Sequence, residues 1–249
     1  MKDVAEAVAR ALHISYTRAE RITLTSNQLK VIAILAMVFD HCMVVFVPHD
    51  LAVYEFLRLP GKLTAPIMCF LIAEGYYHTS NLPKYMGRLF WMAIISHIPF
   101  TLCFGYDVWA FWRATDVMWS LLFGLIALTA YHQKSWSGGR KLIVILLCCL
   151  LSYSADWNYI AVLMILSYGV FRGYKNKKTA AHIGVGGLYL LQGALEGASV
   201  TARLGVFFSI PLLRRYNGKR GRKSKALQWA FYWFYPVHLL LLYFLQQWI

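Results

Sequence analysis

Long apolar runs alternate with short polar stretches along most of this chain. A helix that crosses the hydrocarbon core of a bilayer needs about 20 mostly apolar residues. Nine runs approach or reach that length, and the fifth, sixth and eighth are short. They cover residues 28–47, 62–79, 84–105, 115–132, 140–155, 157–172, 179–196, 199–214 and 227–248. The pattern predicts an all-α fold, a polytopic transmembrane helical bundle of about nine spans within residues 27–249.

Residues 1–26 differ from the rest because they are polar and of mixed charge. The first apolar run begins only after them, so no cleavable signal peptide is expected. Within this segment Val4, Val8 and Leu12 recur at helical spacing among charged residues. Two interpretations stay open, a short interfacial helix on the cytoplasmic side or a solvated tail.

Composition agrees with a membrane protein. The chain has 249 residues, of which 59% are hydrophobic and only 14% charged, whereas soluble domains carry about 25% charged residues. The nine runs leave no room for a large soluble domain.

The net charge of +14 comes from 25 Lys and Arg against 11 Asp and Glu. With the N-terminus in the cytoplasm, only Arg58, Lys62, Arg113 and Arg203 of those 25 fall on the opposite side. This bias follows the positive-inside rule and supports the span count. It predicts a multi-pass protein of the bacterial cytoplasmic (inner) membrane, with the lipid bilayer as a partner and Ile249 outside. No nucleic-acid-binding pattern accompanies the charge, so no nucleic-acid partner is expected.

The densest basic run, residues 214–225, lies in the last predicted cytoplasmic loop. One interpretation is a topology determinant that contacts anionic lipid. The other is attraction of a polyanionic cytoplasmic cosubstrate, such as the phosphates of coenzyme A.

The cysteines predict free thiols. Their number is odd, all lie in apolar stretches, and none forms a Cys-x-x-Cys pair: Cys42, Cys69, Cys103, Cys148 and Cys149. Neither a disulfide framework nor a metal site is expected.

Adjacent acidic and imidazole side chains, Asp40 and His41, stand in the middle of the first apolar run. Ionisable groups at membrane depth are costly and usually face the interior of a bundle, where they have a role. Lys30 lies eleven residues before His41, about three turns, so the two share one helix face about 16 Å apart along the axis. Asp40 is about 100° around the helix from His41, so both can line one cavity without pointing at each other.

Further ionisable groups occur in other predicted spans. Glu74 and His78 are four residues apart, so they can interact on one helix face. Arg88 can neutralise Glu74 or meet an incoming phosphate or carboxylate. His238 can meet His41 or a substrate, and His97 is expected to be a hydrogen-bonded packing residue.

Residues of these types suit proton transfer. A histidine that is oriented by a carboxylate can take a proton from an amine or a hydroxyl as it attacks an activated acyl group. A serine acyl-enzyme is not indicated, because the chain lacks a Gly-x-Ser-x-Gly elbow.

Several stretches resemble the TraX family of membrane acetyltransferases, named for N-terminal acetylation of F-type pilin in conjugation. The strongest features are Asp40-His41 in the first span and Pro66-Ile67 and Glu74-Gly75 in the second. The matching stretches are 29–41, 58–75, 78–81, 85–89, 156–157 and 234–239. One departure is Lys62, where an arginine is expected and where lysine cannot give bidentate geometry. The Lys30 to His41 spacing is also similar to that of the wider membrane acyltransferase-3 group.

The resemblance implies an integral-membrane N-acetyltransferase that uses acetyl-CoA as cosubstrate and acts on an amine of a peptide or pilin-like acceptor. His41 is then the candidate base, Asp40 orients it or the acceptor amine, and His238 is a second catalytic candidate. The candidate residues for binding substrate or coenzyme A are Lys30, Glu74, Tyr85 and Arg88, and the secondary candidates are His78, His97 and Asp156.

Two other functions remain open at this stage. One keeps the chemistry but transfers the acetyl group to a sugar hydroxyl of a surface polysaccharide. The other is a proton-coupled transporter that uses the buried acids and histidines as a relay, although no internal repeat typical of transporters is visible.

Overall fold

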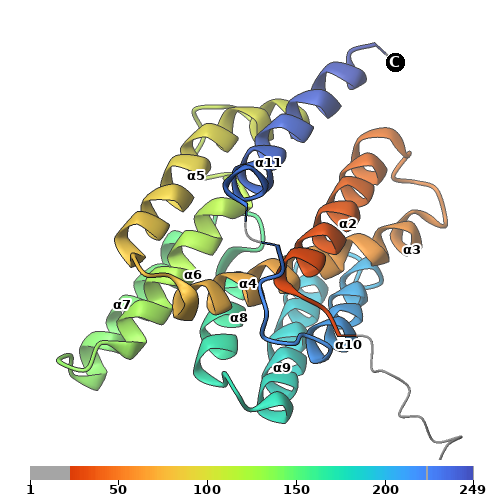
Figure 1. The fold of residues 1–249 in the computed structure, drawn as a ribbon. Coiled ribbons are helices and arrows are strands. Elements are labelled where there is room, and N and C mark those ends of the chain that lie inside the picture. The colour runs from red at the N-terminus through yellow and green to blue at the C-terminus, as the bar shows by residue number, and fades with distance from the viewer. Residues whose placement is uncertain (1–22, 223, 249) are drawn as a thin grey trace, which may run out of the picture.

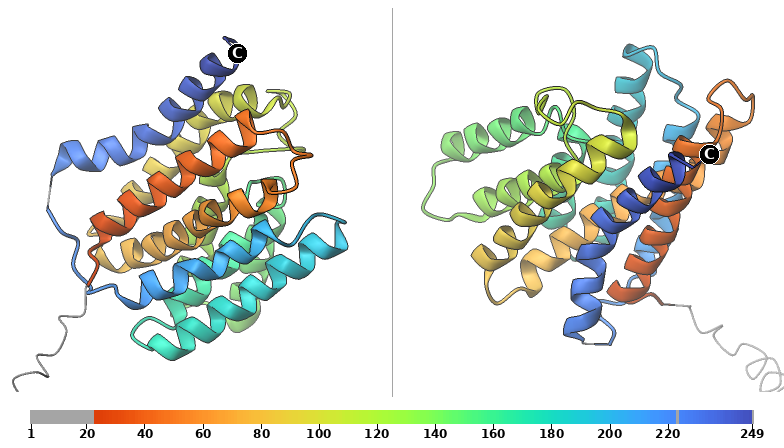
Figure 2. Two further views of the ribbon diagram at one scale, coloured as in Figure 1. Left: turned by 90° about the vertical axis from the view of Figure 1, so that its right-hand side faces the viewer. Right: turned by 90° about the horizontal axis from the view of Figure 1, so that it is seen from above.

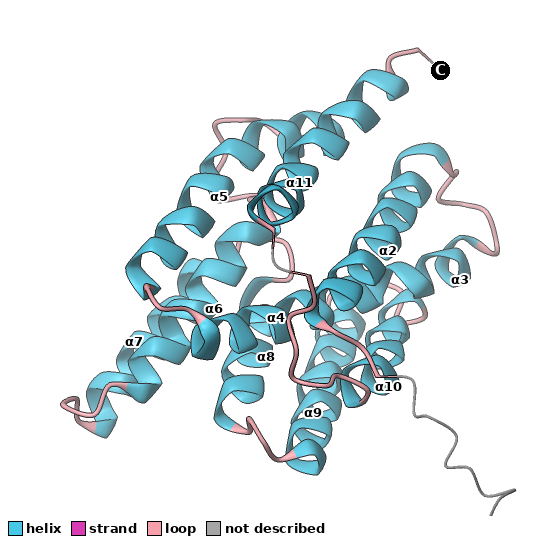
Figure 3. Cartoon of the chain, in the orientation of Figure 1, coloured by secondary structure: helices cyan, strands magenta, loops and turns pink. Residues whose placement is uncertain are grey.

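The computed structural model describes residues 23–222 and 224–248, and within them nearly all regular structure is helical. Figure 1 shows long helices that lie beside one another, most of them slanting across the view, and Figure 3 shows the same chain by secondary structure. The only strand-like contacts in these residues are two isolated bridges, Leu24 to Tyr216 and Thr115 to Ala155. The predicted all-α fold is therefore confirmed. The proposed interfacial helix of residues 1–26 and the outside position of Ile249 concern residues that lie wholly or mostly outside the described ones.

The long helices follow the predicted runs to within a few residues, whereas the run at 199–214 divides into two short elements. Their bounds are α2 Ser26–Phe46, α3 Tyr54–Arg58, η1 Leu59–Leu63, α4 Thr64–His78, α5 Leu82–Phe104, α6 Val117–His132, α7 Gly138–Leu151, α8 Asn158–Val170, α9 Lys175–Leu195, η2 Ala202–Phe208, α10 Ser209–Arg214 and α11 Lys225–Gln246.

Local sequence explains where the helices begin and end. Thr25 and Gln28 form a capping box at the start of α2, which satisfies backbone N–H groups that the first turn leaves unpaired. The side chains of Asn81 and Ser224 likewise accept hydrogen bonds from backbone N–H groups in the first turns of α5 and α11. Gly105, with φ 70°, ends α5.

Fewer elements than were predicted meet the combined criterion of length and apolar character for a membrane helix. In the described residues three helical stretches are long and apolar enough to cross a membrane: Ser26–Phe46, Tyr54–His78 and Leu82–Phe104. The apolar helices α6 and α8 are shorter. These helices are compatible with a membrane protein, while the count of nine spans stays a prediction.

The exposed surface is unusually apolar. On α7 the side chains of Leu142, Ile143, Leu146 and Leu150 are all more than half exposed. Large exposed apolar patches mark interaction surfaces, including those that face lipid.

The core lies where α4, α6 and α8 meet. Helix α8 packs on both α4 and α6, and small residues allow the close approach: a Cβ on Gly124 would overlap Ile165. Helix α11 packs mainly against α5 and stands between α5 and α2 (Figures 1 and 2). This arrangement leaves the inner faces of α2 and α11 beside a cavity.

Candidate functional site

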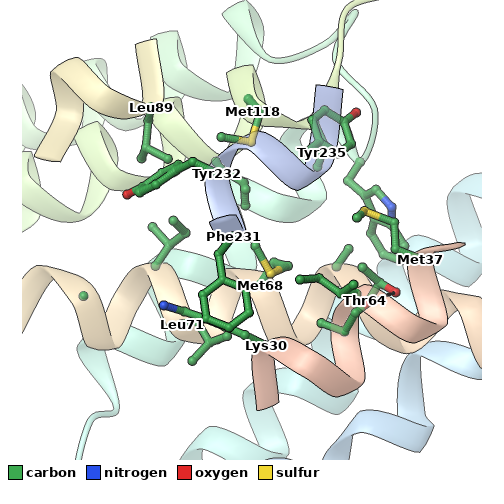
Figure 4. A pocket seen from close by; sticks show the side chains of 18 of the residues that line it. Lys30, Met37, Thr64, Met68, Leu71, Leu89, Met118, Phe231, Tyr232 and Tyr235 are labelled. Carbon is green, nitrogen blue, oxygen red and sulfur yellow. Dashed lines mark hydrogen bonds between the residues drawn. The ribbon is translucent and has the colours of Figure 1, made fainter. Parts of the chain in front are cut away.

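A cavity of about 940 Å³ lies between α2, α4, α5 and α11. Lys30 and His41 both line it, so it extends along three turns of α2, about 16 Å. Figure 4 shows Lys30 near the Phe231 ring of α11, with Met68 of α4 behind and Tyr235 further along α11. The prediction that Lys30, Asp40 and His41 face one interior space is confirmed.

Two histidines meet beside this cavity. Nδ1 of His41 lies 2.8 Å from Nε2 of His238, and Nδ1 of His238 lies 2.9 Å from the carbonyl oxygen of Phe234. The predicted meeting of these two imidazoles is therefore confirmed. A carbonyl oxygen only accepts hydrogen bonds, so Nδ1 of His238 carries a proton.

The network then assigns the tautomer of His41. A neutral His238 that is protonated on Nδ1 accepts a hydrogen bond at Nε2, so Nδ1–H of His41 donates to it. This leaves Nε2 of His41 with a lone pair. Because His41 lines the cavity, that lone pair is available to a molecule inside it.

Asp40 is held by two cations. Arg58 donates to both carboxylate oxygens, at 2.9 and 3.1 Å, and Lys62 donates to Oδ2 at 3.1 Å. In the described residues the hydrogen bond that orients His41 comes from His238, and Asp40 supplies none. The prediction that Asp40 orients the His41 ring is therefore not supported by any hydrogen bond in that part of the chain, since the partners of its oxygens are Arg58 and Lys62. The alternative, that Asp40 orients the acceptor amine, stays a prediction.

The backbone of η1 makes this ion cluster possible. A Cβ on Gly61 would overlap the side chain of Asp40, and a Cβ on Gly205 would overlap the backbone of Leu59. Glycine at both positions lets η1 fit between α2 and η2. Arg58 and Lys62, on either side of Gly61, are thereby brought to the Asp40 carboxylate.

Glu74 has a different partner from the one predicted. Arg172, 98 positions along the chain, donates to its two oxygens at 3.2 and 3.4 Å. His78 lies 3.4 Å from Glu74, which confirms the predicted contact between those two. The suggested pairing of Glu74 with Arg88 is wrong, since Arg172 from the end of α8 occupies that place.

The end of the cavity around Lys30 is positively charged. Arg88 lies 3.5 Å from the Tyr232 hydroxyl and stacks over the Tyr85 ring at 5.5 Å, and Lys30 lies 5.0 Å from the centre of the Phe231 ring. Further cations on this lining are Lys84 and Arg220. Among the described residues no carboxylate forms an ion pair with any of the four. A phosphate-bearing molecule would find unpaired cations here.

The secondary candidate residues differ in whether they line the cavity. His97 is absent from the cavity lining: its Nε2 donates to the Val108 carbonyl at 2.9 Å and its ring stacks on Phe111. That is the packing role predicted for it. Asp156 does line the cavity, within electrostatic range of Asp40, Arg58 and Lys62, and His78 lines it as well.

Arg58 and Lys62 belong to the site, although they were not among the residues predicted for it. Their spacing of four residues places both on one side of a helical segment, and they are two of the few cations on the predicted outer side. A signal for these two residues was therefore available in the sequence. Both are cations that break the charge bias, and the aspartate is predicted to be buried.

Comparison with known proteins gives a consistent result. A family model described as TraX protein matches residues 25–246. A curated protein described as "Probable fimbrial assembly protein FimC, serogroup H1" from Dichelobacter nodosus is 30% identical over 237 residues, covering 90% of this chain and 96% of that protein. No solved structure matches the chain. The match to the family model spans the cavity, the histidine pair and the Asp40 cluster alike, and the chain belongs to the TraX family.

Proposed function

We propose that this protein is a multi-pass acetyltransferase of the bacterial cytoplasmic membrane. It moves the acetyl group of acetyl-CoA to an amine, the N-terminus of a pilin-like protein or small peptide. The observation that carries the proposal is one cavity that joins two features. Within the described residues, the cations at one end form no ion pair, and the histidine at the other end has one ring nitrogen without a hydrogen bond. The family, and a relative named for fimbrial assembly, support an acceptor of the pilin type.

The cationic end of the cavity suits acetyl-CoA, the donor of the acetyl group. Lys30, Lys84, Arg88 and Arg220 are placed to bind the phosphates of coenzyme A, and arginine favours phosphate through paired hydrogen bonds. The pantetheine arm is an extended chain of comparable length to the 16 Å between Lys30 and His41. The thioester then reaches His41 while the nucleotide stays at the cationic end.

The chemistry needs one base. The neutral amine attacks the thioester carbonyl, Nε2 of His41 takes the proton that the amine loses, and a C–N bond forms. The C–S bond then breaks, and His41 returns its proton to the leaving thiolate. The products are an acetylated amine and coenzyme A thiol, and His41 ends in its starting state.

The cluster around Asp40 contributes electrostatics. Arg58 and Lys62 line the cavity and carry two positive charges against one on Asp40. Their remaining N–H groups supply donors for the oxyanion that forms during attack. Asp40 holds both cations in place.

The test uses the purified protein in proteoliposomes with labelled acetyl-CoA and two acceptors, a pilin-like peptide with a free N-terminus and a surface polysaccharide. We expect a mass gain of one acetyl group on the peptide N-terminus. Transfer only to the polysaccharide would contradict the amine acceptor. Solute uptake without any transfer would contradict the enzyme itself.

A further inference from the structure

Asp156 occupies a distinctive place in the cavity. It lies in the loop between α7 and α8, and its side chain is exposed to the interior space that Asp40 and His41 also line. Asp40 and His41 come from α2, so the carboxylate of Asp156 reaches the same space from a separate element. A molecule beside His41 is therefore within the region that Asp156 also borders.

The backbone fixes Asp156 firmly. Its N–H donates to the Thr115 carbonyl at 2.8 Å, and its carbonyl accepts from the Ser120 hydroxyl at 3.0 Å. The next residues, Trp157 and Asn158, have φ of 64° and 31°, the only positive values at non-glycine positions in the described residues. Such strain persists where the surroundings enforce it, and it clusters at functional sites.

Within residues 23–222 and 224–248 no side chain forms a hydrogen bond or ion pair with the carboxylate of Asp156. Arg58 and Lys62 lie close enough to act on it electrostatically, but both are bound to Asp40. A carboxylate that borders an interior cavity is stabilised by a positively charged partner. A ligand that carries a cation can supply that partner.

We propose that Asp156 binds the ammonium group of the acceptor at the end of the cavity opposite the coenzyme A phosphates. This inference rests on the proposed acetyl transfer and deepens it, because it selects a primary amine over a sugar hydroxyl. The ammonium form is the common one for a peptide N-terminus near neutral pH.

Asp156 also accounts for a proton that His41 does not take. An amine attacks only after its ammonium form has lost one proton, and burial raises the pKa of the Asp156 carboxyl, which favours the transfer. Asp156 takes this first proton and later releases it to water. His41 takes the second proton during attack and gives it to the thiolate, so the protons balance.

The test compares Asp156→Asn with Asp107→Asn, a control in the exposed loop after α5. For each full-length protein, KM is measured for a peptide with a free N-terminal amine and for acetyl-CoA. The inhibition constant is measured for the same peptide with a hydroxyl in place of the amine. In Asp156→Asn we expect the peptide KM to rise about tenfold or more, as for loss of one charged hydrogen bond. The acetyl-CoA KM and the hydroxyl-peptide inhibition constant stay unchanged.

The outcomes separate this inference from the proposed function. Wild-type protein that acetylates no peptide contradicts the function. Wild-type protein that acetylates the peptide, with an unchanged peptide KM in Asp156→Asn, overturns the role of Asp156 alone. If Asp156→Asn does not fold, the wild-type protein decides: equal binding of the amine and hydroxyl peptides overturns the inference, and stronger binding of the amine supports it.

Discussion

At the scale of single residues, the two histidines of the cavity differ in what their second ring nitrogen contacts. Nδ1 of His238 is committed to the Phe234 carbonyl, whereas Nε2 of His41, a residue that lines the cavity, has no hydrogen-bond partner in the described part of the chain. His238 is thus a positioning residue that fixes the tautomer of His41, and His41 is the group that touches the substrate in our proposal. Sequence reasoning left the choice between the two open, since it depends on a hydrogen bond across 197 positions.

Two substitutions of His238 test whether this residue acts by positioning the His41 ring. The amide oxygen of His238→Gln can accept the hydrogen bond from His41 where Nε2 stood, so this variant retains substantial acetyl transfer. His238→Ala leaves the tautomer of His41 unfixed and lowers kcat about 100-fold, the low end for loss of general base catalysis. Steady-state kinetics of both variants check this, and equal kcat in the two would argue against tautomer control.

At the scale of elements, the sequence predicted the long helices well and the short ones poorly. The runs at 28–47 and 84–105 became α2 and α5 almost unchanged, because long apolar periodicity is a strong signal. The run at 199–214 instead divides into η2 and α10, and α3 and η1 were not foreseen. These short segments depend on tertiary contacts such as the fit of Gly61 against Asp40, which no local pattern encodes.

The fit of η1 can be tested with two glycines. In Gly61→Ala the added methyl group overlaps Asp40, so η1 must shift and the Asp40 cluster is disturbed. We expect a loss of about 1–3 kcal/mol in stability and reduced acetyl transfer. Gly87→Ala in α5 is the control, because a Cβ there meets nothing within 4 Å and alanine favours a helix. Thermal unfolding in detergent measures both, and a neutral Gly61→Ala would contradict the close fit.

At the scale of the whole molecule, charge is distributed unevenly along one cavity. Cations that form no ion pair within the described residues gather around Lys30, and a compensated cluster surrounds Asp40. The sequence indicated the interior location of these groups through their apolar surroundings. It could not indicate their partners, because pairs such as Glu74 with Arg172 join distant helices.

The uneven charge predicts a selective effect on the donor. Arg88→Ala is expected to raise the KM for acetyl-CoA about tenfold, the equivalent of one charged hydrogen bond, with little change in the KM for the peptide. Added salt should weaken acetyl-CoA binding in the wild type, because the cations are screened. Arg113→Ala, an exposed arginine outside the cavity, is the control. A larger effect on the peptide KM than on the acetyl-CoA KM would reverse the assigned ends.

The most direct measurement of the central claim is acetyl transfer by His41→Asn. The amide nitrogen of asparagine keeps the donor to His238 where Nδ1 stood but offers no base in place of Nε2. With labelled acetyl-CoA and the peptide, we expect transfer to fall at least 100-fold, while binding of acetyl-CoA is retained and the exposed His49→Asn control keeps full activity. Transfer at the wild-type rate by His41→Asn would contradict the account.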